Sequence, residues 1–382
     1  MKQKTIFRCT IMRGGTSKGI FLMEEDLPRD PQLRDRIILA IFGSPDIRQI
    51  DGLGGADSLT SKLALITPSK EPGRDVNYTF GAVGIDKPFV DYSANCGNIS
   101  SAVGPFAIEK GLVRPEEPFT TVKIFNTNSR RMIHAKVPVK RGKVVYEGDY
   151  EIAGVPGTGA KIGLSFMDPG GGVTDRLLPT GNAMDEVELD TGEKFLVTIV
   201  DAGNLTAFVR ANDFGLQGTE LPDFFDQDAK FRMRLEAIRK RMGDLIGIQT
   251  TPSIPKIIFI APSQNFKTLT GREINKNEID LVARAVAMGK IHKAFPVTGG
   301  IPAAAASAIP GSIIQQVVED SRSESEGKKL IIGHPSGKFD VEVKARQEGD
   351  QVRILSCTVG RTARKIMEGR VYIPKKAYRK DG

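Results

Sequence analysis

Two short segments of this sequence are apolar almost all the way round a helix, and they restrict the folds open to the chain. The first covers residues 97–110, with Pro105 inside it and Gly111 as a C-terminal stop. The second covers residues 301–309 and includes a run of alanines. A helix that is apolar on every side must be covered on every side. Segments with the alternation of β-strands recur throughout the chain. We therefore predict an α+β fold in which strands wrap around a central apolar helix.

The chain is long enough to build this arrangement twice. A length of 382 residues suggests two domains. Loop-rich stretches at 168–172 and 178–182 indicate a boundary just after them. We predict two pseudo-symmetric domains, one over 1–185 and one over 186–370, with the tail 371–382 packing back on the first. The active site is expected in the cleft between them.

The net charge of +8 raises the question of a nucleic-acid partner. The densest basic run, from Arg232 to Arg241, carries apolar residues at helical spacing, which is typical of an amphipathic helix. The chain has no Trp and no aromatic residues interleaved with basic ones for stacking bases. We therefore expect no nucleic acid and a small anionic substrate, because positive potential steers anions into a cleft.

Other classes of protein are excluded by what the sequence lacks. No segment approaches the length of a membrane-spanning helix, so no membrane partner is expected. The three cysteines are too widely spaced for a disulfide framework or a metal site. We expect a cytoplasmic protein without metal or cofactor. A homodimer is our default for the oligomeric state, with no residue pattern behind it.

The turn that precedes the first apolar helix holds a candidate catalytic thiol. Asn95, Cys96, Gly97 and Asn98 stand between a short strand and a helix that starts at once. A helix N-terminus offers unpaired amide groups and a partial positive charge, so it favours a thiolate and binds anions. A buried, inert cysteine is the alternative, but the turn-forming neighbours favour an exposed sulfur.

Two glycine clusters supply further polar groups. Ser17 and Lys18 lie in RGGTSKG, which lacks the spacing of a phosphate-binding P-loop but could hold an anionic oxygen. An ordinary turn with a surface lysine is an equal alternative. Lys62 follows GLGGADSLTS and begins a buried strand. A lysine held at a strand mouth can act as a base, although such lysines more commonly extend their ammonium group to solvent.

The turn before the second apolar helix contains the remaining candidates. Thr298, Gly299 and Gly300 precede that helix, and His292 lies at the end of an apolar helical stretch just before them. His292 could line the same cleft. The histidines show no metal-ligand spacing.

Several long motifs resemble one family. MRGGTSKG, GSPDxRQIDGLGGADSLTSK, DYSANCGNISSAVGPFAIEKG, LPTGN, VTGG, IPG, HPSG and VGRTARKIMEG are similar to those of the 2-methylaconitate isomerase family. That family includes 2-methylaconitate cis–trans isomerase, 3-methylitaconate Δ-isomerase and 4-oxalomesaconate tautomerase. The resemblance runs from about Ile6 to Tyr372. It implies a diaminopimelate-epimerase-like fold with two similar domains.

The resemblance also implies roles for individual residues. The general acid/base pair of the family falls on Lys62 and Cys96. Its carboxylate-binding loops fall on the remaining candidates, which are Ser17, Lys18, Gly97, Asn98, Thr298, Gly299 and Gly300. Related epimerases and proline racemases carry a second catalytic cysteine where this sequence has Val297. Stereoinversion by two thiols is therefore disfavoured.

We accordingly predict a cofactor-independent isomerase that shifts a proton along an allylic unit of a small unsaturated di- or tricarboxylate. ADSLTSK and GVPG favour the methylitaconate and oxalomesaconate branch over the 2-methylaconitate branch. Which of the two groups removes the proton stays open. The alternatives are an amino-acid epimerase or racemase on the same fold and a non-catalytic carboxylate-binding protein.

Overall fold

The computed structural model describes residues 5–92, 95–226, 229–251, 254–287, 290–318, 328–349 and 351–378. The chain divides into two compact units. Unit 1 comprises Met1–Leu164 and Gly360–Gly382, and unit 2 comprises Ser165–Val359. Two strands, β9 (Ile162–Met167) and β20 (Gln351–Arg361), each contain a unit boundary.

The division differs from the predicted boundaries at residues 185 and 370. The loop that suggested the first boundary is tied into unit 2, because Gly171 N donates to Asp201 O and Asp201 N donates to Leu177 O. The Asp201 carboxylate also accepts hydrogen bonds from the amides of Val173 and Thr174. A loop held by its backbone in this way cannot serve as a linker.

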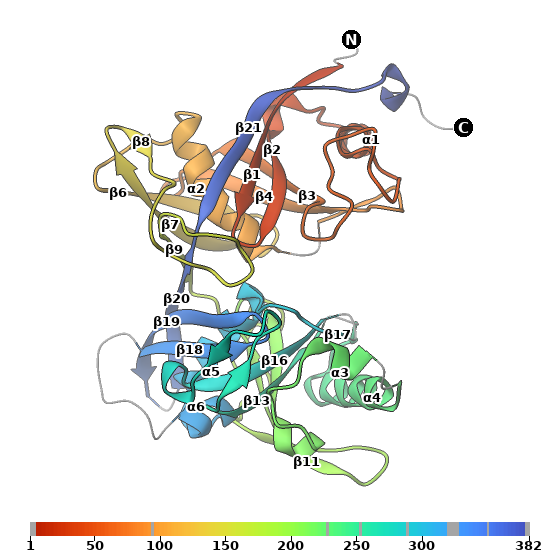
Figure 1. The fold of residues 1–382 in the computed structure, drawn as a ribbon, viewed down its shortest axis with the longest axis vertical. Coiled ribbons are helices and arrows are strands. Elements are labelled where there is room, and N and C mark those ends of the chain that lie inside the picture. Colours follow the sequence, from red (N-terminus) through yellow and green to blue (C-terminus); the bar gives the residue numbers. More distant parts are fainter. Residues whose placement is uncertain are drawn as a thin grey trace. The chain divides into compact units, whose positions relative to one another are not determined.

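Unit 1 is built from strands that follow one another through a curved sheet. Its strands are β1 (Ile6–Gly14), β2 (Ser17–Met23), β3 (Lys62–Pro68), β4 (Val76–Val83), β5 (Val90–Asp91), β6 (Phe119–Asn126), β7 (Arg131–Lys140), β8 (Lys143–Val144) and β21 (Ala363–Tyr372). β21 pairs antiparallel with β1, and β1 with β2. Parallel pairs join β2 to β3 and β4 to β6. Figure 1 shows β21, in blue, running beside β1, in red.

Helix α2 (Gly97–Glu109) lies inside this sheet. Residues 99–108 of the helix are buried, and the helix packs against strands from every part of the unit, including β1, β2, β3, β6, β7 and β21. The predicted helix and its internal Pro105 are confirmed. Phe106 of α2 packs on Phe21 of β2, with ring centroids 5.5 Å apart. The outer side of the sheet is covered by α1 (Pro31–Phe42), which is capped by the side chain of Asp30.

Unit 2 repeats the plan. Its strands are β10 (Asp185–Glu188), β11 (Lys194–Asp201), β12 (Leu205–Arg210), β13 (Lys256–Pro262), β14 (Phe266–Lys267), β15 (Glu273–Ile274), β16 (Leu281–Ala287), β17 (Lys290–Ile291), β18 (Lys328–His334) and β19 (Gly337–Glu348). Its central helix is α5 (Val297–Ser307), which packs against β11, β12, β18, β19 and the short helix α6 (Ile313–Val318). Strands therefore surround an apolar helix in each unit.

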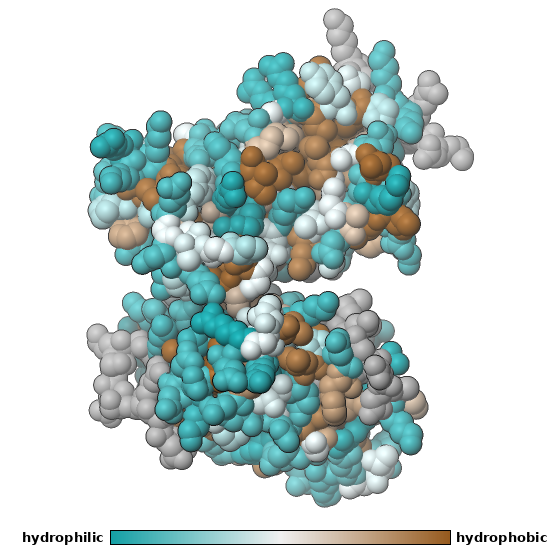
Figure 2. All heavy atoms as spheres, viewed as in Figure 1, coloured by the Kyte–Doolittle hydropathy of each residue, from teal (hydrophilic) through white to brown (hydrophobic). Residues whose placement is uncertain are grey.

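The basic run that could have suggested nucleic-acid binding lies in α4 (Ala229–Ile246), beside the short helix α3 (Pro222–Asp226). Leu235, Ile238 and Met242 of α4 are buried in the core of unit 2, so the predicted amphipathic helix is confirmed. Figure 2 shows hydrophilic side chains over much of the visible face, with apolar side chains gathered in patches between them.

The predicted helix before His292 is wrong. The stretch LVARAVA instead forms strand β16, which pairs with β13 and turns back through β17. A short apolar run bounded by turns fits a buried strand as well as a helix, and here neighbouring strands on both sides decide the outcome.

The two units share one topology and a local sequence pattern. In unit 1, hairpin β1–β2 is followed by β3, parallel to β2, and then by antiparallel β4. In unit 2, hairpin β11–β12 is followed by β13, parallel to β12, and then by antiparallel β16. The equivalent strands read KLALITP in β3 and KIIFIAP in β13. Each unit then enters its apolar helix from a short strand, β5 or β17.

Because α2 is enclosed on every side, we predict that truncating its core contacts destabilises unit 1. Phe106→Ala removes a side chain that is 2% exposed, so it should cost about 3–5 kcal/mol of stability. Calorimetric melting of the variant should show a lowered midpoint. Phe89→Ala, at a side chain 50% exposed, is the matched control and should melt close to the unchanged protein. Equal effects at both positions would contradict the enclosure of α2.

Candidate active site

Lys62 and Cys96, the predicted acid/base pair, are in contact. Lys62 Nζ donates a hydrogen bond to Cys96 Sγ at 3.2 Å. Lys62 is the first residue of β3, and Cys96 is the N-cap of α2. Lys62 is half-buried, and Cys96 is 7% exposed. A base and an acid that share one proton at this distance can exchange protons with a substrate and with each other.

Glycines in the β1–β2 hairpin allow the hairpin to approach the start of α2. Gly15 lies in the two-residue turn with φ of +52°, and a Cβ atom there would lie 2.2 Å from Asn98 Oδ1. A Cβ atom on Gly14 would lie 2.6 Å from Asn98 O. The amide of Asn98 donates from Nδ2 to Thr16 Oγ1 at 3.0 Å, which fastens the turn to the helix. RGGTSKG is therefore a hairpin that packs on a helix start.

The backbone around Cys96 is held by short polar contacts. Asn95 Oδ1 accepts from Cys96 N at 2.7 Å and from Asn126 Nδ2 at 3.2 Å. The amide and hydroxyl of Ser100 both donate to Cys96 O, at 3.1 and 3.0 Å. The amides of Gly97 and Asn98 lie in the first turn, where a helix has no internal acceptor for them. The start of α2 thus presents N–H groups beside the thiol, as predicted.

Ser17 and Lys18 point to opposite faces of β2, because successive side chains of a strand alternate. Ser17 shares its face with Gly19, whose Cβ position meets Ile99 of α2 at 2.9 Å. Its hydroxyl is buried and makes no hydrogen bond within the part of the chain that the structure describes. Lys18 is on the other face, where its ammonium lies 3.3 Å from the Cβ position of Gly55. The structure brings Ser17, and not Lys18, to the face of α2.

Two aromatic residues beside the pair were missed by the sequence analysis. The ammonium of Lys62 lies 5.8 Å from the ring centroid of Phe80, on β4. Tyr78, two residues earlier, is fully buried, and its pKa is raised well above the usual value, first by burial and then by the charge of Cys96. Tyr78 therefore stays protonated beside the thiol. Both residues lie in β4, where alternation of apolar and polar residues indicates a half-buried strand and carries no sign of chemistry.

In unit 2, Thr298 lies in the first turn of α5, and its hydroxyl accepts a hydrogen bond from Lys256 Nζ at 2.9 Å. Burial lowers the pKa of Lys256 to about 8. Lys256 was not predicted as a site residue, because a single lysine before an apolar strand carries no motif.

The expected roles of Gly299 and Gly300 need correction. Their amides donate to Pro296 O at 2.9 and 3.0 Å, because α5 starts at Val297 rather than after the glycines. The helix leaves the amides of Val297 and Thr298 without an internal acceptor instead. A Cβ atom on Gly300 would lie 2.2 Å from Phe339 Cε1, so this glycine allows close packing of the helix on β19.

His292 organises the segment that leads into α5. Its amide donates to Ala285 O at 2.8 Å, and its ring Nδ1 lies 2.7 Å from Ala294 O and 3.1 Å from Ala294 N. One ring nitrogen is thus engaged by the backbone of the turn. The imidazole therefore stabilises the turn that precedes α5.

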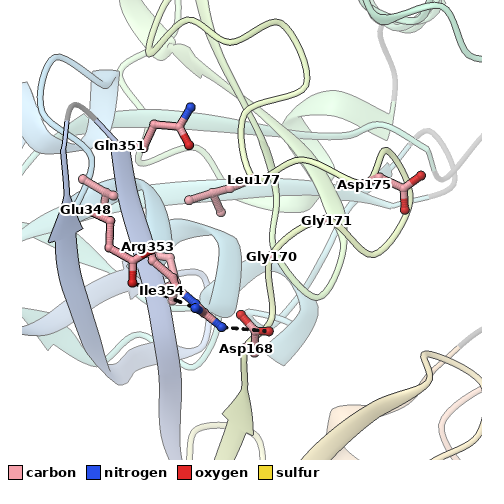
Figure 3. Close-up of a pocket in the computed structure, with 10 residues that line it drawn as sticks. Asp168, Gly170, Gly171, Asp175, Leu177, Glu348, Gln351, Arg353 and Ile354 are labelled. Atoms are coloured by element: carbon pink, nitrogen blue, oxygen red, sulfur yellow. Dashed lines mark ion pairs between the residues drawn. The ribbon is translucent and has the colours of Figure 1, made fainter.

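Unit 2 has a surface hollow of about 240 Å³ that is lined by charged side chains and contains no lysine–thiol pair (Figure 3). Arg353 lies between Asp168 and Glu348, at 3.7 and 3.9 Å, and all three side chains are about half exposed. None of the predicted site residues lines this hollow.

Across the described ranges, no group of three or more His, Cys, Asp or Glu side chains could hold a metal ion. No helix in those ranges is long and apolar enough to cross a membrane.

Comparison with family models gives a match over residues 3–374 to the PrpF protein family. This chain belongs to the PrpF family. Among curated relatives, it is 44% identical to 3-methylitaconate isomerase of Eubacterium barkeri, over 96% of this chain and 97% of the relative. It is 39% identical to 2-methyl-aconitate isomerase of Shewanella oneidensis, over 96% of each chain. Identity to 4-oxalomesaconate tautomerase of Pseudomonas putida is also 39%, over 97% of each. The predicted family is therefore confirmed.

Solved structures agree with the family. The crystal structure of methylitaconate-delta-isomerase matches with a TM-score of 0.88 at 42% identity, covering 98% of this chain and 97% of that chain. A hydroxyproline epimerase from Agrobacterium vitis matches with a TM-score of 0.56 at 12% identity, covering 99% of this chain and 96% of that chain. The second likeness is one of fold alone, and it confirms the predicted epimerase-like α+β fold.

The geometry predicts different reactivities for the three cysteines of this PrpF-family protein. Burial raises the pKa of Cys9, and it raises that of Cys357 to about 12. Cys96 is the most exposed of the three, at 7% against 3% and 0%, and it accepts a hydrogen bond from an ammonium group. Iodoacetamide should therefore modify Cys96 first, as measured by peptide mass spectrometry over time.

The Lys62→Met variant serves as the control for that labelling. Removing the ammonium destabilises the thiolate, so labelling of Cys96 should slow while labelling of Cys9 and Cys357 stays the same. Faster modification of either buried cysteine, or no change at Cys96 in the variant, would contradict the contact.

Proposed function

We propose that this protein is a cofactor-independent isomerase that moves a proton along an allylic unit of a small unsaturated di- or tricarboxylate. The contact between Lys62 Nζ and Cys96 Sγ carries the proposal, because it puts a proton acceptor and a proton donor 3.2 Å apart at a helix N-terminus. Relatives named as isomerases and tautomerases of such acids support it.

The chemistry balances with these two groups alone. Proton transfer from the Lys62 ammonium to the Cys96 thiolate across their 3.2 Å contact first gives an amine and a thiol. The amine of Lys62 removes a proton from a carbon next to the double bond, and the electron pair spreads into a dienolate. The Cys96 thiol gives its proton to the other end of the allylic unit, and the double bond moves. Lys62 is then an ammonium again and Cys96 a thiolate, which is the starting state. Rotation within the dienolate before reprotonation would give cis–trans isomerisation.

The start of α2 supplies the stabilisation that the dienolate requires. We assign the amides of Gly97 and Asn98 to the substrate carboxylate on which charge develops. A preorganised donor of this kind is typically worth about 3 kcal/mol. The buried hydroxyl of Ser17, which makes no hydrogen bond within the described part of the chain, faces the same helix and fits a second donor. Lys18, on the opposite face of β2, is the weaker of the predicted binding residues.

The substrate we propose first is 3-methylitaconate. Identity to the relative named for that acid is 44%, against 39% for the relatives named for 2-methylaconitate and 4-oxalomesaconate. ADSLTSK and GVPG favour the methylitaconate and oxalomesaconate branch over the 2-methylaconitate branch, and the equal identities of 39% do not separate the last two acids. Few residues separate such substrates, because one methylene changes binding in an apolar pocket by only about 1–3 kcal/mol.

The amino-acid epimerase alternative is not favoured. Stereoinversion by two thiols needs a cysteine at the start of the second helix, and this chain has Val297 there. Cys357 lies near α5, with Sγ 3.7 Å from Ile301 O, but it is fully buried. The oligomeric state and the location are separate questions from the reaction. A homodimer and a cytoplasmic location stay predictions from the sequence. The three free cysteines support a reducing compartment.

Proton NMR in D₂O tests the reaction directly. The protein is incubated in turn with 3-methylitaconate, 2-methylaconitate and 4-oxalomesaconate. We expect migration of the double bond in 3-methylitaconate, with deuterium appearing at the carbon that is reprotonated. Exchange at the α-carbon of an amino acid would favour the epimerase instead. Binding of all three acids by folded protein, with no exchange in any, would contradict the isomerase.

Replacing either member of the pair should lower turnover and leave folding intact. Lys62→Ala removes the base and should reduce kcat by about 10²–10⁴-fold. Cys96→Ser should reduce kcat more than it raises KM, because a hydroxyl keeps the size of the thiol but gives up its proton far less readily. Steady-state kinetics and melting curves check both variants. Turnover at the unchanged rate by either one would remove that residue from the mechanism.

A further inference from the structure

The loop between α1 and β3, residues 43–61, leads directly to Lys62 and folds around a buried amide. Gln49 lies in this loop, and its side chain is 2% exposed. A Cβ atom on Gly54 would lie 2.2 Å from Gln49 Cδ, so this glycine leaves the room that the amide occupies. A loop of this length without strands or helices is uncommon in a compact domain unless it has a function.

The Gln49 amide is hydrogen-bonded at both of its polar atoms. Oε1 accepts from the backbone amide of Ala56 at 2.8 Å, which fixes the orientation of the group. Nε2 donates to Ser44 Oγ at 2.9 Å and to Ser61 Oγ at 2.8 Å. One side chain thus joins the beginning of the loop, a point further along it and the residue that precedes Lys62.

The backbone of Gln49 is held in an unfavourable conformation. Its φ of +46° lies in the left-handed region, which a residue with a side chain rarely adopts. Such a conformation persists where the surrounding contacts fix it, and it is found often at functional sites. The three hydrogen bonds of the amide are contacts of that kind. The strain therefore indicates a role for this amide beyond closing a loop.

Ser61 connects Gln49 to the start of β3. Its hydroxyl accepts from Gln49 Nε2 and donates to Val83 O at 2.9 Å, while Val83 N donates to Ser61 O at 3.1 Å. Lys62, the next residue, is the first of β3, so the strand continues on only one side of it. The hydrogen bond between Gln49 and Ser61 holds the chain on the other side.

We propose that Gln49 is a positioning residue for the acid/base pair. By holding Ser61, it fixes the first residue of β3 and keeps Lys62 Nζ at 3.2 Å from Cys96 Sγ. Proton exchange depends steeply on such a distance, since a misplacement of about 1 Å can lower a rate about 10²-fold. This inference rests on the proposed isomerase function and extends it to a residue outside the Lys62–Cys96 pair.

Labelling of Cys96 by iodoacetamide reports the contact without any need for turnover. Gln49→Met keeps the approximate size of the side chain and removes its amide. It should slow labelling of Cys96 by about 2- to 10-fold, which is the effect of weakening one hydrogen bond. A variant that merely loosened unit 1 would have the opposite effect, because the buried Cys9 would react faster. Gln264→Met, which removes an amide bonded to Gln217 O in unit 2, is the matched control and should change neither rate.

A double variant shows whether Gln49 acts through Lys62. In the Lys62→Met background the contact is already lost, so adding Gln49→Met should not slow labelling of Cys96 further. A further change in the double variant would overturn the proposal, as would an unchanged rate at Cys96 in Gln49→Met or faster labelling of Cys9. Ser61→Ala removes the same hydrogen bond from the other side and should also slow labelling of Cys96. It tests the proposal if melting curves show that Gln49→Met is not folded.

Steady-state kinetics separate this inference from the proposed function. Gln49→Met should lower kcat for 3-methylitaconate by up to about 10²-fold, with KM within about threefold of the unchanged protein, because the amide holds the acid/base pair and not the substrate. A raised KM with kcat unchanged would overturn the role of Gln49 while the isomerase stands. Slower labelling of Cys96 in Gln49→Met, in a protein that turns over none of the three acids, would remove the isomerase and keep the effect of Gln49 on the Lys62–Cys96 contact.

Discussion

The need to cover an apolar helix on every side governs both units of this protein. Strands from the whole of unit 1 surround α2, so polar groups meet the helix at its two ends, at the first turn and at Glu109. Everything polar in the unit 1 site is gathered at that turn. Lys62 reaches it from the mouth of β3, and the β1–β2 hairpin reaches it because Gly14 and Gly15 have no Cβ atoms. The same enclosure that stabilises the unit therefore positions its chemistry.

Much of this arrangement could be predicted from the sequence. Continuous apolar character identified both central helices, and the Asn95–Asn98 turn indicated a thiol at a helix start. What sequence reasoning could not supply was the pairing of strands. The hydrophobic pattern of residues 281–287 fits a buried strand as well as a helix. Pairing with the neighbouring strand β13 makes this segment a strand. The equivalence of Lys256 and Lys62 is visible only when β13 is matched to β3 through their strand partners.

The sequence also could not predict the residue at which a helix begins or the face of a strand to which a side chain points. One turn of difference in the start of α5 changes which amides are free, because Gly299 and Gly300 then bond to Pro296 O. The split between Ser17 and Lys18 is of the same kind. Both residues stand in one motif, yet alternation along β2 sends their side chains to different faces. A motif places residues in a segment, and the backbone then decides which of them face the site.

The separation of the two atoms proposed to exchange protons with the substrate bears on the kind of reaction that the fold can support. Inversion at a carbon requires one group to remove a proton from one face and another group to return it to the opposite face. Lys62 Nζ and Cys96 Sγ are 3.2 Å apart, so a planar dienolate cannot lie between them. Both must approach it from the same side, which suits removal at one end of an allylic unit and return at the other. An epimerase-like fold with this pair is therefore better suited to moving a double bond than to inverting a centre.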